Sequence, residues 1–479
     1  MRLSIFKTYN STFWTANTME LFERMAWYGM FILLANYLTG PVEKGALGFS
    51  QSEKGLMMST LAGLVYFLPI LTGAIADRYG YKRMLLVSYA MMIVGYLLLS
   101  VFKTFWPIYF SFIWLAVGAA CFKPVISATV SKTTNDENSS IGFGIFYMLV
   151  NIGAFIGPFI AAKLKVFSYD YVFYASAGII FINILLLLFI FKEPVIVKTE
   201  ENLQKTIKRI FRSIAQAMVD WKFLLFLVII GLFWAMYFQL FYTFPVFIEQ
   251  WVDLEQFFLD IQHLSPWLAD LLGNGHGKIE SEMLVNADAM YIVLFQVIVS
   301  ALVMKLKPLH SMIAGIFICA IGIGLTVATL NPFFMLLSVF IFALGEMMSS
   351  PKVTEYIGKI APKEKVALYM GFSFFPLFIG NVIAGVLSGP VYERISDKYS
   401  LLATELQANS MMLDIPSEGV RSAAYFQSAA DAFGLSAEQL TESLYLKYQP
   451  DSIWMIFTGI GIFASISLFL YNRFLVKPS

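Results

Sequence analysis

Charged residues are scarce in this sequence. Only 14% of the 479 residues are Asp, Glu, Lys or Arg, whereas 58% are hydrophobic. Soluble domains carry about 25% charged and roughly 45–50% apolar residues, so the composition excludes a soluble globular domain. It indicates a polytopic membrane protein. The net charge of +1 gives no sign of a nucleic-acid partner, and we expect none.

Cysteine and histidine are rarer still. Cys121 and Cys319 lie inside apolar runs, and the three histidines are far apart in the sequence. Neither residue type has the spacing of a metal site, and the cysteines form no disulfide framework. No nucleophile stands beside a base in a motif that would favour a membrane-embedded enzyme, the alternative class. We therefore expect no metal, no cofactor and no enzymatic activity.

Long apolar runs are what the sequence has instead. Twelve reach the length of about 20 residues that spans a bilayer. They lie near residues 14–38, 54–76, 84–102, 106–131, 142–163, 171–191, 222–248, 284–304, 311–330, 333–357, 366–388 and 453–472. The charged segment 193–221 has apolar residues at helical spacing, which indicates an amphipathic linker helix on the cytoplasmic membrane surface. The expected fold is all-α, with six-helix bundles at 1–192 and 222–479.

Lys and Arg gather on one side of these spans. They fill the central linker and the loops after spans 2, 8 and 10, and cytoplasmic loops are enriched in both residues. Both termini are thus predicted to be cytoplasmic, and the insertions at about 250–283 and 389–452 external. The second insertion has a capping-box pattern at Ser436 and Gln439, which predicts a short helix. We interpret it as a soluble cap or lid, with a plain spacer as the alternative.

Three charges interrupt the first apolar run, in the stretch MELFERMAWYG. Each of Glu20, Glu23 and Arg24 would cost about 2.5–3.5 kcal/mol near the bilayer centre without a partner. Their spacing places all three on one helix face, and Lys123 in the fourth span lies at a similar depth. Carboxylates and cations at close quarters have coupled titrations and can bind a proton. The alternative is a static ion network that fixes helix packing.

A further carboxyl group, Glu346, lies near the middle of the tenth span. Pro351 follows it, and we expect this proline to break the helix and expose backbone groups to a cavity. A carboxylate in each half, facing a midline cavity, suits a solute with a positive end. A protonated, inert Glu346 is the alternative.

Several motifs resemble those of a known family. GAIADRYGYKR resembles the loop 2–3 signature of the major facilitator superfamily. ELFERMAWYG, FKPVIS, FGIFYMLVNIGAFIGP and GEMMSSPKVTEYIGKIAP resemble segments of the proton-coupled oligopeptide transporters within that superfamily. The resemblance implies the major facilitator fold with twelve transmembrane helices. The loop signature comprises Gly73, Asp77, Arg78, Gly80, Lys82 and Arg83.

Carried over residue by residue, the resemblance assigns roles to individual side chains. It assigns proton coupling to Glu20, Glu23, Arg24 and Lys123. It assigns substrate binding to Tyr28, Tyr66, Asn151, Asp288 and Glu346. Among these, Glu346 would meet the amino end of the substrate, and Asp288 stands where an amide usually contacts the same group.

The resemblance also implies a function. It is that of a symporter importing di- and tripeptides or peptide-like solutes by alternating access, driven by the proton gradient without a cofactor. The expected partners are the solute, protons and the lipid bilayer. A monomer in a bacterial inner membrane is the expected form.

The sequence departs from the family pattern at informative positions. Phe31 replaces an arginine that would bind the substrate carboxylate, Phe238 replaces a glutamate, and Ser373 replaces a tryptophan. The linker is also too short for the two extra helices that bacterial members often carry, since each would need about 20 residues. These departures leave a non-peptide organic solute as the alternative substrate.

Overall fold

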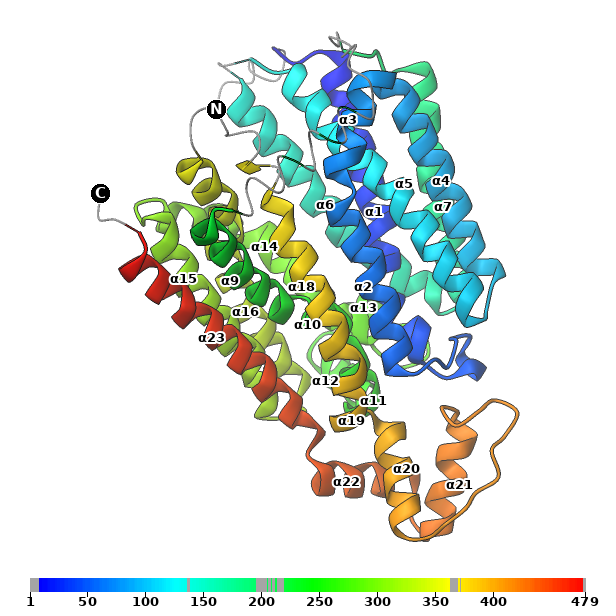
Figure 1. Ribbon diagram of the computed structural model, residues 1–479. Helices are drawn as coiled ribbons and strands as arrows, with labels where there is room; N and C mark the ends of the chain where they lie inside the picture. Colours follow the sequence, from blue (N-terminus) through cyan, green and yellow to red (C-terminus); the bar gives the residue numbers. More distant parts are fainter. Residues whose placement is uncertain are drawn as a thin grey trace.

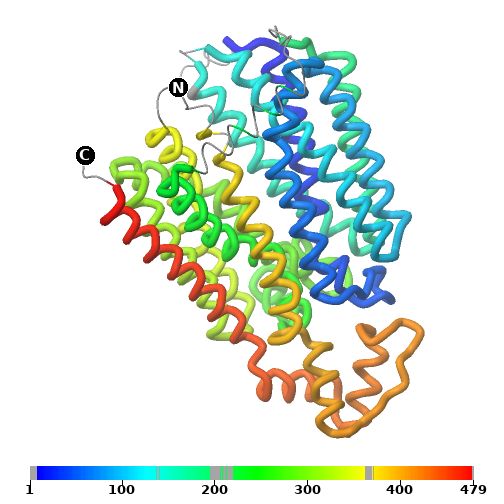
Figure 2. Tube along the Cα trace, in the orientation of Figure 1, coloured from blue at the N-terminus to red at the C-terminus, as the bar shows by residue number. Residues whose placement is uncertain are grey.

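The computed structural model describes residues 8–135, 138–194, 205, 208, 212, 219–361, 369–370 and 372–476. The described residues form helices and no β-strand; a single isolated bridge joins Gly273 and Ile279. The amphipathic helix predicted for 193–221 falls mostly outside the described residues. Figure 1 shows the helices arranged as two bundles, and Figure 2 follows the chain from the first bundle, in blue and cyan, into the second.

The first bundle contains six spans. Its helices are α1 (Ser11–Thr39), α2 (Gln51–Phe67), α3 (Pro69–Tyr79), α4 (Tyr81–Val101), α5 (Phe105–Lys132), α6 (Ser139–Lys165) and α7 (Tyr169–Phe189). The pair α2 and α3 forms one span that bends by 45°. The bend falls where Pro69 starts α3, because proline is tolerated in the first turn of a helix and interrupts a helix elsewhere.

The second bundle contains the other six. Its spans are α9 (Trp221–Tyr237) with α10 (Gln239–Tyr242) and α11 (Phe244–Trp251), then α14 (Ser281–Val303), α15 (Pro308–Gly324), α16 (Pro332–Ile360), α18 (Phe375–Val386) and α23 (Ile453–Phe474). Eleven spans within the described residues are long and apolar enough to cross a membrane when the bent pair counts as one. The 29-residue α1 is the twelfth, and its three charges lower its hydropathy. The predicted twelve-helix fold class is therefore confirmed.

One local prediction, the helix break at Pro351, is wrong. Pro351 does not break its helix, because α16 runs without interruption through it to Ile360. Proline is tolerated in membrane helices where neighbouring groups satisfy the freed carbonyl. After α18 the chain bends at Gly389, whose backbone is non-helical, and continues into α19 (Tyr392–Ile395). The bend lies next to residue 388, where the eleventh span was predicted to end.

The two insertions fold into short helices. The first carries α12 (Leu254–Leu264) and α13 (Pro266–Leu272), and the second carries α20 (Lys398–Ala408), α21 (Ala423–Phe433) and α22 (Ala437–Tyr448). We call residues 397–449 the cap. Figure 1 shows the cap at the end of the molecule away from both termini, and we call these two ends the cap end and the terminal end.

The cap is a folded body and not a plain spacer. Its three helices bury an apolar core: Leu401, Leu402, Leu406, Phe426, Ala429, Ala430, Leu440 and Leu444. The capping box predicted at Ser436 and Gln439 is confirmed at the start of α22. Such a cap satisfies two backbone N–H groups that would otherwise lack partners.

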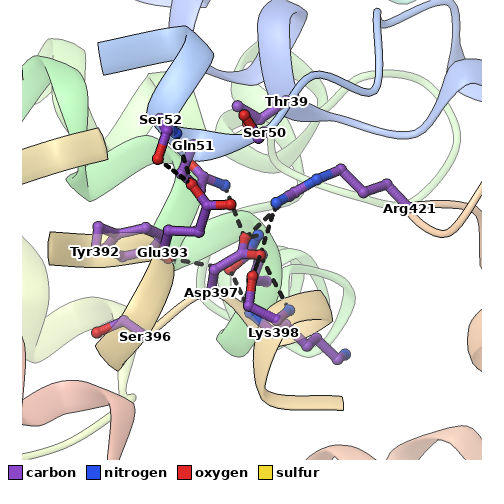
Figure 3. Close-up of polar contacts among 12 residues, drawn as sticks. Thr39, Ser50, Gln51, Ser52, Tyr392, Glu393, Ser396, Asp397, Lys398 and Arg421 are labelled. Atoms are coloured by element: carbon purple, nitrogen blue, oxygen red, sulfur yellow. Dashed lines mark hydrogen bonds and ion pairs between the residues drawn. The ribbon is translucent and has the colours of Figure 1, made fainter. Parts of the chain in front are cut away.

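One carboxylate connects the cap to both bundles. Asp397 is fully buried and accepts hydrogen bonds from Gln51 of α2 at 2.8 Å and from Gln250 of α11 at 2.9 Å. The Arg421 guanidinium of the cap binds its two oxygens at 3.0 and 2.7 Å, as Figure 3 shows. Burial alone would lower the pKa of Arg421, but the Asp397 carboxylate raises it above its usual value.

The same junction has a second acidic contact. Glu393 of α19 accepts the backbone N–H of Ser52 at 2.8 Å and also its hydroxyl group. Close by, an added Cβ at Gly55 would collide with the backbone of Gly385, so α2 and α18 approach closely at this point. The bundles are therefore joined at the cap end by hydrogen bonds and by direct backbone packing.

The orientation of the chain can be tested with two cysteine variants. Glu438 is exposed in the cap, Lys305 is exposed at the terminal end, and both native cysteines are buried. If the cap end is external, a cysteine at 438 reacts with an impermeant maleimide in intact cells, and a cysteine at 305 reacts only after permeabilisation. The reverse pattern would overturn the assigned topology.

The connection at Asp397 predicts a stability effect. Asp397→Asn leaves Arg421 buried without its counter-charge, which costs about 3–5 kcal/mol when a buried pair loses one partner. We expect a lowered melting temperature in detergent and faster proteolysis within the cap. Glu405→Gln is the matched control, because its partner Lys447 is exposed. Equal melting temperatures for both variants would show that Asp397 does not hold the cap.

Candidate solute and proton site

A cavity of about 280 Å³ lies between the two bundles. Six residues predicted from the sequence line it together: Tyr28, Tyr66, Lys123, Asn151, Asp288 and Glu346. They come from α1, α2, α5, α6, α14 and α16. Residues far apart in the chain thus meet around one enclosed space, which is the usual form of a small-molecule site. We call this space the central cavity.

Two carboxyl groups meet on the side of the second bundle. Asp288 and Glu346 both line the central cavity and lie close enough to interact electrostatically, and the Tyr237 hydroxyl donates to Glu346 Oε1 at 3.1 Å. Asp288 Oδ1 and Glu346 Oε2 are buried and have no hydrogen-bond partner. Two adjacent carboxyl groups cannot both be ionised without a compensating charge. This acid pair therefore needs a proton or a bound cation.

Lys123 faces the central cavity from the first bundle. Its Nζ lies 4.6 Å from the centre of the Tyr66 ring and 5.9 Å from that of Phe374, and such rings stabilise a cation. Among the described residues it makes no ion pair. On the next residue of α5, Pro124 packs against Gly73 of α3, where an added Cβ would lie 3.4 Å from the Pro124 ring.

The charges of α1 form a compact buried cluster. Arg24 pairs with Glu20 at 3.3 Å and also binds Glu23, and all three side chains are buried. Glu23 Oε1 is buried without a partner. Toward the cavity, the Arg24 guanidinium lies 5.8 Å from the Tyr28 ring. One cation thus serves two carboxylates, and the remaining negative charge is a place for a proton.

An aromatic wall completes the central cavity. Phe31 stacks on Trp27 at 6.0 Å between ring centres, and Phe238 lies 5.8 Å from Trp234. The positions where the family resemblance leads one to expect charge are therefore apolar surface. The indole N–H of Trp234 is buried without a partner, so this wall also offers one free donor.

Sequence reasoning missed several cavity residues, including three that carry a hydroxyl or an indole N–H. Tyr147, Trp234 and Tyr237 line the central cavity beside the predicted residues. Trp234 and Tyr237 precede Phe238 and Phe241 on the same helical face, and that spacing of three and four residues was the available signal. Tyr147 stands four residues before Asn151, whose side chain donates to its carbonyl.

The loop 2–3 motif lies at the terminal end, away from the cavity. Asp77 accepts a hydrogen bond from the Tyr81 hydroxyl at 2.9 Å. Gly80 has φ of +100°, a conformation that favours glycine. The carboxylate of Glu193 accepts the backbone N–H groups of Tyr81 and Lys82. The motif thus ties the turn between α3 and α4 to the segment after α7.

The two arginines of this motif lie on the surface of the turn. The Arg78 guanidinium lies 5.6 Å from the Tyr79 ring, and Arg83 is exposed. Lys82 reaches back to the Leu188 carbonyl at 3.4 Å.

A second ion cluster joins the bundles at the cap end, and sequence reasoning missed it. Lys165 of α6 pairs with Glu280 at 2.8 Å and Glu282 at 3.0 Å, and Asn36 of α1 donates to Glu282 at 2.9 Å. Although burial would raise it, the Lys165 ammonium lowers the pKa of Glu280 to about 2. This cluster adds further contacts between the two bundles at the cap end, where Asp397 also joins them.

A fully buried lysine strengthens the same closure. Lys54 of α2 donates to the Tyr242 carbonyl at 2.9 Å and lies 5.3 Å from the Tyr392 ring. Tyr242 in turn donates to the Met58 carbonyl.

No group of three or more His, Cys, Asp or Glu in the described part of the chain is placed to hold a metal ion.

Comparison with known proteins supports the resemblance read from the motifs. The Major Facilitator Superfamily profile matches residues 19–385. The chain is 30% identical over 160 residues to dipeptide and tripeptide permease A of Serratia proteamaculans, covering 32% of this chain and 30% of the relative. It is 32% identical over 162 residues to the transporter YclF of Bacillus subtilis, covering 33% of each. These alignments span about a third of those relatives' length.

Longer matches extend the comparison. Multidrug resistance protein MdtH of Aeromonas hydrophila is 23% identical over 358 residues, covering 72% of this chain and 80% of the relative. A POT family transporter in complex with 5-aminolevulinic acid aligns over 97% of this chain and 96% of its own, with a TM-score of 0.70 at 17% identity. Fold and sequence profile agree over most of the structure, and the chain belongs to the Major Facilitator Superfamily.

Proposed function

We propose that this protein is a proton-coupled symporter for di- and tripeptides or peptide-like solutes, working by alternating access. The observation that carries the proposal is the charge arrangement of the central cavity. An unpaired lysine faces it from one bundle, and an acid pair with unpaired oxygens faces it from the other. The names of the permease relative and of the structural neighbours point to the same solute class.

The cavity can hold a zwitterion across the two bundles. Lys123 meets the carboxylate of the solute, and Asp288 with Glu346 meets its ammonium group. The free Trp234 N–H can donate to a peptide carbonyl. An unpaired buried polar group costs about 1–3 kcal/mol, so a solute that supplies these partners gains that much per group.

Proton coupling is assigned to the buried cluster on α1. A proton on Glu20 or Glu23 balances the excess negative charge there and changes how tightly Arg24 is held. Tyr28 lies between Arg24 and the central cavity, where Lys123 also stands. The charge state of the cluster therefore acts on Lys123 and, through it, on the bound carboxylate.

Orientation and assembly belong to the same proposal. Both termini lie in the cytoplasm of a bacterial cell, the cap faces outward, and the protein works as a monomer in the inner membrane. The positive-inside bias of the loops supports this orientation. In the conformer described here, the cap end is closed by contacts between the bundles.

A non-peptide organic solute is the second candidate. It is favoured by the aromatic wall around Phe31 and Phe238, which replaces expected charges with apolar surface. The similarity to a protein named for multidrug resistance points in the same direction. Uptake assays with dipeptides and with apolar organic cations would separate the two candidates.

The coupling assignment predicts the behaviour of two variants in proteoliposomes. Lys123→Ala and Glu20→Gln should each abolish accumulation of a dipeptide under an imposed proton gradient, because each removes one charge of the coupled set. Solute counterflow needs no net proton movement and should persist in Glu20→Gln. Lys103→Ala is the control, since that lysine pairs with Asp170 on the exposed surface. Continued accumulation in both variants would refute the assignment.

The cavity also predicts end-group selectivity. The amino end meets two carboxyl groups and the carboxylate meets one lysine, so N-acetylation of Ala-Phe should abolish competition and amidation should weaken it by less than about tenfold. Phe31→Arg should increase the preference for the free acid, with Phe31→Leu as the control. A strong free-acid requirement in the unmodified protein would show that another cation binds the carboxylate.

A further inference from the structure

A second cavity, of about 270 Å³, lies between the cap and the bundles. It is bounded by the end of α1, by α11 and by the cap helices, and its lining includes Asn36, Glu249, Lys398, Tyr399 and Phe426. We call it the cap cavity. In size it matches the central cavity.

The cap cavity contains a cation that no carboxylate neutralises. Lys398 Nζ lies 4.3 Å from the centre of the Phe426 ring and 5.9 Å from that of Trp251, and it makes no ion pair with any described residue. Burial, with the nearby Lys44, lowers the pKa of Lys398 to about 8. The ammonium lacks a counter-ion among the described residues.

A carboxylate, Glu249, lines the same cavity. Glu249 Oε1 pairs with Lys278 at 2.7 Å and with Lys44 at 3.9 Å, whereas its buried Oε2 has no partner among the described residues. The cap cavity therefore repeats the composition of the central cavity: a free ammonium, a carboxylate oxygen without a donor, and aromatic rings. Buried polar atoms usually have partners, so the unpaired Glu249 oxygen is unusual, and the half-buried Lys398 adds a cation to the same cavity.

The two cavities follow one another along the same helices. On α1, Ile32 lines the central cavity and Asn36 lines the cap cavity, and four residues of α-helix span about 6 Å. On α10, Phe241 lines the central cavity, and on the following α11, Val246 lines the cap cavity. Between the cavities lies Tyr242, fully buried, whose hydroxyl bonds to Asn381 at 2.7 Å. The barrier is about one helical turn thick.

We infer that the cap cavity is an outer binding site, in which a zwitterionic solute waits beside the closed barrier before it enters the central cavity. Lys398 binds the carboxylate of the solute, and Glu249 Oε2 accepts its ammonium group. The inference rests on the proposed function for the identity of the solute. The cap then has a direct role in capture, since it contributes Lys398 and Phe426 to the site.

The test compares uptake of Ala-Phe from the two sides of the membrane. Lys398→Met should raise the KM from the cap side about tenfold, the loss expected for a charge-assisted contact, and leave the KM from the terminal side unchanged. Lys398→Arg should keep the cap-side KM within about twofold, because it keeps the cation. Lys447→Met is the control, since that lysine lies on the cap surface and pairs with Glu405. Equal cap-side KM values in all four proteins overturn the inference.

Equilibrium binding separates this inference from the transport proposal. In an Asp288→Asn, Glu346→Gln double variant, the central cavity loses its acid pair and the cap cavity is unchanged. Ala-Phe should still bind to this protein by calorimetry, and the further change Lys398→Met should remove the binding. No binding to the double variant overturns the outer site even if the unmodified protein transports Ala-Phe. Binding of Ala-Phe to the double variant, combined with no transport of Ala-Phe by the unmodified protein, would refute only the symporter proposal.

Discussion

A fully buried carboxylate needs donors on every side, and Asp397 receives them from three separate parts of the chain. Gln51 comes from the first bundle, Gln250 from the second, and Arg421 from the cap. Loss of any one donor leaves a charge that is costly to bury. The closure of the cap end, the docking of the cap and the shape of the cap cavity all depend on this one group. Opening of the cap end requires Gln51 to leave it.

The buried charges are distributed unevenly along the path between the two ends. At the cap end, Lys165 meets two carboxylates and Asp397 meets a guanidinium, so charge is compensated and the contacts hold the bundles together. Around the central cavity, Lys123 and the acid pair are not compensated by the protein. Compensated charge supports structure here, whereas uncompensated charge is available to protons and solute.

The sequence was sufficient for features set by local patterns. Span lengths, the capping box at Ser436 and the motif residues around the central cavity were all predictable, because each depends on neighbours a few residues away. The hydrogen bonds around Asp397 were not predictable, because Gln51, one of their donors, is 346 positions away in the sequence. The uninterrupted helix at Pro351 was mispredicted for a related reason. Whether a helix continues past a proline depends on tertiary neighbours that the local sequence does not reveal.

The connectivity of the cap determines how it moves. Its chain leaves α19 and returns to α23, both in the second bundle, while its contacts with the first bundle are hydrogen bonds to side chains such as Gln51 and Glu43. The cap is therefore covalently attached to the second bundle and only hydrogen-bonded to the first. In the proposed alternating-access motion it would move with the second bundle and would need no hinge of its own. One rigid-body motion would then unlock the barrier and uncover the waiting solute at the same moment.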